Sequence, residues 1–172
     1  MKTRLVKTLV VLIAVLAVGA LVATDAAAQV NAMSGKSKMT YTKREVVPVG
    51  DVEGHIFMLG DASGLNTNTG KWAFMDGAKA RSVGFQELTK GNGPQTGYFI
   101  LSKDGSETVA KITGTIKTVL SPEGKPLTTM SGEWKYVKGT GIYEGCTGQG
   151  TYQGGFTAEN EYFVEFKGIL VQ

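Results

Sequence analysis

Cysteine and histidine are nearly absent from this sequence of 172 residues, which contains one of each, Cys146 and His55. A single cysteine cannot form a disulfide within the chain, so the fold must be stabilised by packing. A structural zinc site takes four protein ligands, mostly Cys and His, and two such residues cannot supply them. The sequence also lacks the glycine-rich phosphate-binding motifs and the His-Glu-x-x-His motif. We therefore expect no metal site and no cofactor.

Strong net charge is also missing from most of the chain. Charged residues make up 19% of the sequence and the formal net charge is +3. Residues 1–28 contribute Lys2, Arg4 and Lys7 against Asp25 alone, so the remaining 144 residues are nearly neutral. A balanced surface of this kind does not indicate a nucleic-acid partner or a membrane partner, and we expect neither.

The N-terminus has the three-part pattern of a secretory signal peptide. A basic start is followed by an unbroken apolar run from Leu9 to Ala23 and by the small residues Ala26 to Ala28. The apolar run is shorter than the roughly 20 residues that a membrane-spanning helix needs. We predict a signal-peptide helix in residues 1–28, cleavage before Gln29 and export to the periplasm or the extracellular space, without stable membrane insertion after cleavage.

Residues 29–172 show no amphipathic helical pattern over 12 residues. Instead, β-branched and aromatic residues recur in short alternating runs, separated by Gly, Asn, Asp and Pro, which favour chain reversal. The predicted turns are 65–70, 90–94, 103–106 and 121–126. We predict strands at 39–47, 53–59, 72–75, 80–88, 97–102, 108–120, 128–138, 150–153 and 162–171. The short connections favour an antiparallel meander.

Alternation in the last predicted strand separates an apolar face from a mixed face. Tyr162, Val164, Phe166 and Leu170 share the apolar face. Strands of this kind bury one face each by closing into a barrel, which also removes exposed edges. Glycine makes up about 16% of residues 29–172, against an average near 7%, and glycines within strands allow tight bends. We therefore predict one all-β domain, 29–172, forming an antiparallel closed barrel of about eight strands. A two-sheet sandwich is the alternative.

The segment from Gly139 to Gly150 carries a family resemblance. Its Gly-Thr-Gly, apolar residue, aromatic residue and spaced glycines form a compact turn with Tyr143 at the barrel end. The pattern resembles the corresponding turn of the allene oxide cyclase and dirigent barrels and of small exported bacterial proteins with that barrel. The resemblance implies an eight-stranded antiparallel barrel with an interior cavity. It also implies binding of hydrophobic or phenolic small molecules, and in some members a cyclisation or coupling steered by cavity shape.

Five residues are candidates for a functional site. His55 shares a strand face with Phe57 and Leu59, and it could act as a general base if that face lines the barrel. A structural role for His55 is the alternative. The candidates for stacking a ligand are aromatic residues, which could equally fill the barrel. They are Trp72, Trp134, Tyr136 and Tyr143.

We expect an exported barrel that binds a small apolar or aromatic molecule and has no chemistry of its own. One alternative is a cofactor-free cyclase or isomerase that acts through the cavity, with His55 or a tyrosine assisting proton transfer. Another is a filled barrel that acts as a structural or interaction module, for example as a homo-oligomer. The size of the interior separates them, because ligand pockets usually exceed about 300 Å³.

The predicted cleavage site gives a direct test. When the full chain is expressed in an exporting bacterium, the mature protein should begin at Gln29, because Ala26 and Ala28 fit the narrow subsites of signal peptidase. The intact mass measures the cleavage site. Replacing Ala28 with a bulky residue should leave the precursor uncleaved, and recovery of the full 172-residue mass from the parent chain would contradict the prediction.

Overall fold

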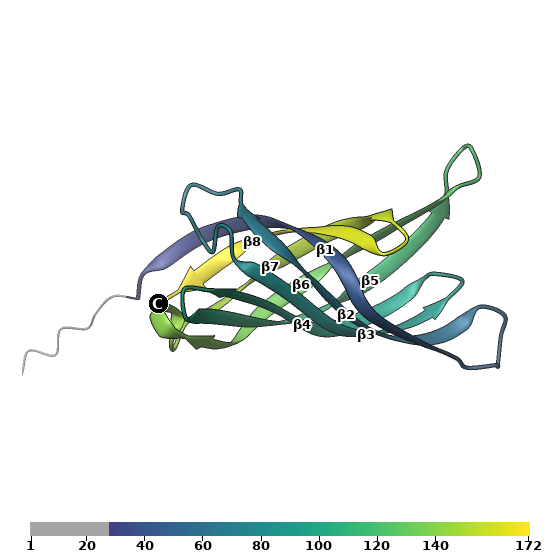
Figure 1. Cartoon of the computed structure of the whole chain (residues 1–172), viewed down its shortest axis with the longest axis horizontal. Helices are drawn as coiled ribbons and strands as arrows, with labels where there is room; N and C mark the ends of the chain where they lie inside the picture. Colours follow the sequence, from purple (N-terminus) through teal and green to yellow (C-terminus); the bar gives the residue numbers. More distant parts are fainter. Residues whose placement is uncertain (1–27) are drawn as a thin grey trace, which may run out of the picture.

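The strands of the computed structural model, which describes residues 28–172, close into a single antiparallel barrel (Figure 1). Each strand pairs with its neighbours in sequence, and β1 pairs with β8 to close the barrel. The elements are β1 (Val30–Pro48), β2 (His55–Asn68), β3 (Lys79–Thr89), β4 (Gly93–Lys103), β5 (Ser106–Leu120), β6 (Pro126–Thr140), the 3-10 helix η1 (Gly141–Tyr143), β7 (Thr147–Ala158) and β8 (Glu161–Val171).

The closed eight-stranded barrel confirms the predicted fold class and excludes the two-sheet sandwich. The predicted signal-peptide helix, in residues 1–28, lies outside the described residues except for Ala28. Within residues 28–172, no helix is both long and apolar enough to cross a membrane.

Two of the predicted local assignments are wrong, one at the end of β2 and one in the loop between β2 and β3. Residues 65–68 belong to β2 and not to a turn, and residues 72–75 form a loop and not a strand. Asn66 explains the difference, because its buried side chain accepts a hydrogen bond from Ser37 Oγ at 3.1 Å and donates one to the Met75 carbonyl oxygen at 2.9 Å. The loop thereby folds back over the barrel end and buries its apolar residues against the interior.

That loop and η1 close one end of the barrel. Phe74 is fully buried, and its ring lies 5.6 Å from that of Tyr143 and 5.4 Å from that of Trp72 between centroids. The β2–β3 loop lies at the same end as the C-terminus in Figure 1, whereas the β1–β2 and β5–β6 turns extend beyond the opposite end. Tyr143 is buried in the compact turn between β6 and β7, as the sequence predicted.

Alternate residues of every strand face the interior. The predicted inner face of β8 is confirmed, since Tyr162, Val164, Phe166 and Leu170 are all buried. Outward neighbours on the same strand, such as Glu165 and Lys167, remain partly or fully exposed. The buried hydrophobic core therefore lies within the barrel and not between two layers.

Inward-facing aromatic rings lie directly over inward-facing glycines. A β-carbon at Gly150 would lie 2.6 Å from Cζ2 of Trp134, and one at Gly60 would lie 2.7 Å from Cε1 of Tyr41. These distances are shorter than any normal carbon contact. Any larger residue at these positions would displace the ring. The other pairs are Phe166 over Gly35, Tyr136 over Gly148, Tyr152 over Gly114 and Gly132, and Trp134 over Gly168.

This packing predicts a position-dependent cost of adding one methyl group. Gly150→Ala should destabilise the protein by about 1–3 kcal/mol because the Lys167 carbonyl oxygen, the Trp134 ring and the Gly168 backbone occupy the space. Gly155→Ala on the same strand is the matched control. Its added carbon meets only ordinary contacts of 3.4 Å or more, and the change should stay within about 1 kcal/mol. Urea unfolding measures both, and equal costs would contradict the packing argument.

Candidate functional site

A cavity of about 60 Å³ lies inside the barrel. Its lining comes from all eight strands and is mainly aromatic and aliphatic. Among the described residues that line it there is no Asp, Glu, His, Lys, Arg or Cys. The polar groups that reach it are therefore amides and hydroxyls only.

Aromatic rings from β4, β6 and β8 line this cavity. Trp134 and Tyr136 lie on β6 with ring centroids 5.0 Å apart, and Phe99 lies 6.1 Å from Phe166. The indole N–H of Trp134 donates to the Thr151 carbonyl oxygen at 3.2 Å. Because that donor is already occupied, Trp134 offers the cavity an apolar ring face.

Two glutamines and two tyrosines form a polar layer across the barrel, which we call the Gln–Tyr layer: Tyr41, Gln86, Gln95 and Tyr152. Gln86 on β3 and Gln95 on β4 are cross-strand partners, and both are buried. Gln95 Nε2 donates to the Tyr152 hydroxyl at 2.8 Å, and Gln86 Nε2 donates to the Tyr41 hydroxyl at 3.5 Å. All four residues line the cavity.

The tyrosines of the interior are held in their neutral form. Burial raises the pKa of Tyr152 to about 12, although its hydrogen bond with Gln95 opposes the shift. Burial also raises the pKa of Tyr41, Tyr136 and Tyr162. Because low dielectric surroundings disfavour the phenolate, these groups remain hydrogen-bonding phenols and are poor bases at neutral pH.

His55 lies outside this cavity. Its strand face, which includes Phe57 and Leu59, points away from the barrel interior, while the alternate residues Met58 and Gly60 are buried. The condition under which His55 could serve the interior as a base is therefore not met in this structure. Sequence alternation separated the two faces of β2, but it did not tell which face was internal.

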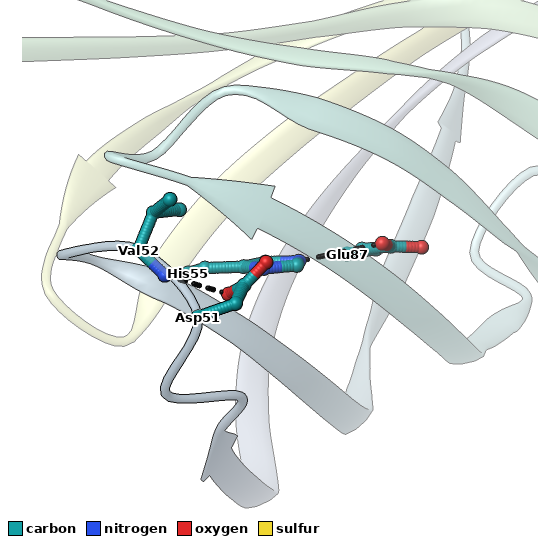
Figure 2. Close-up of polar contacts among 4 residues, drawn as sticks. All are labelled: Asp51, Val52, His55 and Glu87. Carbon is teal, nitrogen blue, oxygen red and sulfur yellow. Dashed lines mark hydrogen bonds and ion pairs between the residues drawn. The ribbon is translucent and has the colours of Figure 1, made fainter.

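His55 instead joins the β1–β2 turn to β3. Its Nδ1 lies 2.6 Å from Asp51 Oδ1 and its Nε2 lies 3.3 Å from Glu87 Oε1, as Figure 2 shows. Asp51 also accepts a hydrogen bond from the Val52 backbone N–H at 2.8 Å. The hydrogen bond with Asp51 raises the pKa of His55 and lowers that of Asp51. This contact fixes the base of a projecting turn.

The structure divides the four aromatic candidates into two groups. Trp134 and Tyr136 line the cavity, whereas Tyr143 and Trp72 lie in the segments that close the barrel end and are not among its lining residues. The Gln–Tyr layer was missed because a buried glutamine carries no apolar signal. The only sequence signal was the alternation of the predicted strand 80–88, which includes Gln86, whereas Gln95 lies just before the predicted strand 97–102.

Cys146 and the acidic residues do not form a metal site in the part of the chain that the structure describes. Cys146 is buried, and burial raises the pKa of its thiol. Over residues 28–172, no three of the His, Cys, Asp and Glu side chains are grouped so that they could hold a metal ion.

Comparison with known proteins gives similarity to solved structures only. No protein-family model and no curated protein matches the chain. Among solved structures, the chain is similar to the pterocarpan synthase dirigent protein GePTS1, with 13% identity, a TM-score of 0.46, and coverage of 84% of this chain and 86% of that chain. The resemblance of residues 139–150 to allene oxide cyclase and dirigent barrels stays a prediction.

The His55 contact predicts a pH dependence of stability. A histidine with a raised pKa stabilises the folded state fully below its unfolded pKa of about 6.5, and this contribution is lost as pH rises through the folded pKa. The melting temperature should therefore fall between pH 6 and pH 9. Asp51, whose pKa is lowered, contributes above about pH 4 and loses its contribution in more acidic solution.

His55→Asn should remove the dependence between pH 6 and pH 9, and Asp51→Asn should weaken it, because Asp51 supplies the shorter contact. Thermal unfolding followed by circular dichroism measures both variants. An unchanged slope in His55→Asn would show that another group is responsible.

Proposed function

We propose that the barrel binds a small apolar or aromatic molecule in its interior and performs no chemistry of its own. The lining of the cavity is the observation that carries this proposal. It combines aromatic rings, among them those of Trp134 and Phe166, with amide and hydroxyl groups from the Gln–Tyr layer. Apolar walls with a few fixed polar groups are typical of small-molecule sites.

The volume of the cavity limits what can enter without rearrangement. Its 60 Å³ is below the roughly 150 Å³ of an engineered apolar cavity that accepts benzene. Met33 and Met130 both line it, and methionine side chains change conformation readily. A ligand of one ring would therefore enter by displacing these two side chains, while the strands stay in place.

The composition of the lining favours binding over acid–base chemistry. The imidazole of His55 lies on the outer face, and the tyrosines of the interior are neutral phenols. A cofactor-free cyclase or isomerase in this barrel would have to act by cavity shape and by hydrogen bonds from neutral groups. Such an enzyme remains the alternative proposal, without a general base.

A filled barrel that associates with a second copy of itself is the second candidate, and the small cavity favours it. Leu59, Phe85 and Tyr98 are each more than 40% exposed on the outer face of β2, β3 and β4. Arg81 and Glu87 lie outward on β3 on either side of Phe85. Two copies packed with these strands antiparallel would place Arg81 of one copy beside Glu87 of the other.

Light scattering that shows a dimer, together with an interior that binds no ligand, would favour this candidate.

Export is also part of the proposed function. The predicted signal sequence of residues 1–28 would place the barrel in the periplasm or outside the cell. A barrel in either compartment would meet its ligand outside the cytoplasm.

Binding should raise the melting temperature of the mature barrel. A ligand at 100 times its dissociation constant adds about 2.7 kcal/mol to the free energy of unfolding, which corresponds to several degrees. We expect such a shift with at least one member of a library of one-ring and two-ring aromatic compounds. Native mass spectrometry should then detect the one-to-one complex.

Ala110→Met should abolish the shift by filling the cavity that Ala110 lines. The matched control is Ala32→Met, because Ala32 is exposed on β1 and its substitution leaves the interior unchanged. Equal shifts in both variants would place the ligand elsewhere. The absence of any shift in the parent protein would remove the binding proposal.

A further inference from the structure

We propose that the ligand carries a neutral oxygen-bearing group, such as a carbonyl or hydroxyl, which the Gln–Tyr layer recognises. This inference rests on the proposed function, since it names the chemistry of the molecule that the interior binds. It starts from the way in which the four side chains are brought together.

Glycines allow the two tyrosines to reach the two glutamines along the barrel wall. Tyr41 on β1 lies over Gly60 on β2 and meets Gln86 on β3. From the other side, Tyr152 on β7 lies over Gly132 on β6 and Gly114 on β5.

The Tyr152 hydroxyl then meets Gln95 on β4. The two tyrosines therefore reach neighbouring strands from opposite directions. The layer therefore consists of two hydrogen-bonded Gln–Tyr pairs whose glutamines are cross-strand neighbours.

The Gln–Tyr layer has more hydrogen-bonding capacity than it uses. Each glutamine amide has one acceptor oxygen and two N–H donors, and each tyrosine has one O–H. Within the described structure, the four side chains make two hydrogen bonds with one another, at 2.8 Å and 3.5 Å, and no others. Buried amides and hydroxyls normally use most of their capacity. The unused donors and acceptors border the cavity, where a bound polar group would use them.

The charge of the lining selects a neutral group. The cavity-lining residues include no cation to balance a carboxylate and no anion to balance an ammonium group. Moving an unpaired charge into such surroundings costs far more than one hydrogen bond returns. A neutral carbonyl or hydroxyl oxygen can accept from a tyrosine O–H or a glutamine N–H without this cost.

The two parts of the lining also define how the ligand lies. An aromatic or apolar body fits against Phe99, Trp134 and Phe166, which offer ring faces. The oxygen then points to the Gln–Tyr layer. The site would therefore distinguish two molecules of the same shape that differ only in this oxygen.

Acetophenone and α-methylstyrene provide that comparison, because they differ by an oxygen in place of a methylene group. Titration calorimetry with the mature barrel should give a dissociation constant about tenfold lower for acetophenone, which corresponds to one hydrogen bond in a buried site. Benzoate, which carries a charge, should bind more weakly than acetophenone.

Gln95→Met and Tyr152→Phe should each bring the ratio of the two dissociation constants close to one while keeping α-methylstyrene binding. Tyr152→Phe retains the ring over Gly114 and Gly132, so it tests the hydroxyl without removing the packing. Tyr98→Phe is the control, because it removes an exposed hydroxyl on the outer face. Circular dichroism establishes that each variant is folded.

The outcomes separate the two proposals. If both compounds bind with equal affinity, the barrel binds apolar ligands and recognition by the Gln–Tyr layer is overturned. If the preference for acetophenone persists in Gln95→Met, in Tyr152→Phe and in the corresponding variants Gln86→Met and Tyr41→Phe, a group outside the Gln–Tyr layer recognises the oxygen and the inference is again overturned. If neither these compounds nor the aromatic library bind, the proposed function itself fails.

Discussion

The close fit of aromatic rings over inward glycines is the constraint on which this barrel depends. An eight-stranded barrel has an interior only wide enough for side chains, so a large ring on one strand requires an absent side chain on the next. Trp134 over Gly150 and Tyr41 over Gly60 show this relation, with less than 3 Å available for a β-carbon. Many of the glycines within the strands are therefore a packing requirement of the interior.

The same packing creates the candidate site. Because Tyr41 and Tyr152 lie flat along the wall, their hydroxyls reach Gln86 and Gln95 on strands that are not adjacent to their own. Burial keeps the phenols neutral. The interior is thus able to form hydrogen bonds, but its lining has no group suited to proton transfer at neutral pH.

The two ends of the barrel differ in their construction. At one end the β2–β3 loop inserts Phe74 against Tyr143. Asn66, near the end of strand β2, holds this loop by the hydrogen bond that its side chain donates to the Met75 carbonyl oxygen. At the other end the β1–β2 turn projects, and His55 ties its base to Asp51 and Glu87 (Figure 2). The histidine that was a catalytic candidate has a structural environment, and its titration bears on the stability of the turn.

Alternation along the chain, turn residues and glycine content determined the all-β class, the meander and the closed barrel, because these depend on local preference and on burying one face of each strand. The same alternation identified the inner face of β8 and placed Trp134 and Tyr136 on one side of β6. It could not say that the His55 face of β2 points outward, nor that residues 72–75 leave the sheet to cover the barrel end. Those features depend on which strands curve toward the common interior and on hydrogen bonds such as that of Asn66, which join residues distant in sequence. The Gln–Tyr layer was decided only by the tertiary structure, since four polar side chains from four strands become one site only when the register of the closed barrel brings them to the same level.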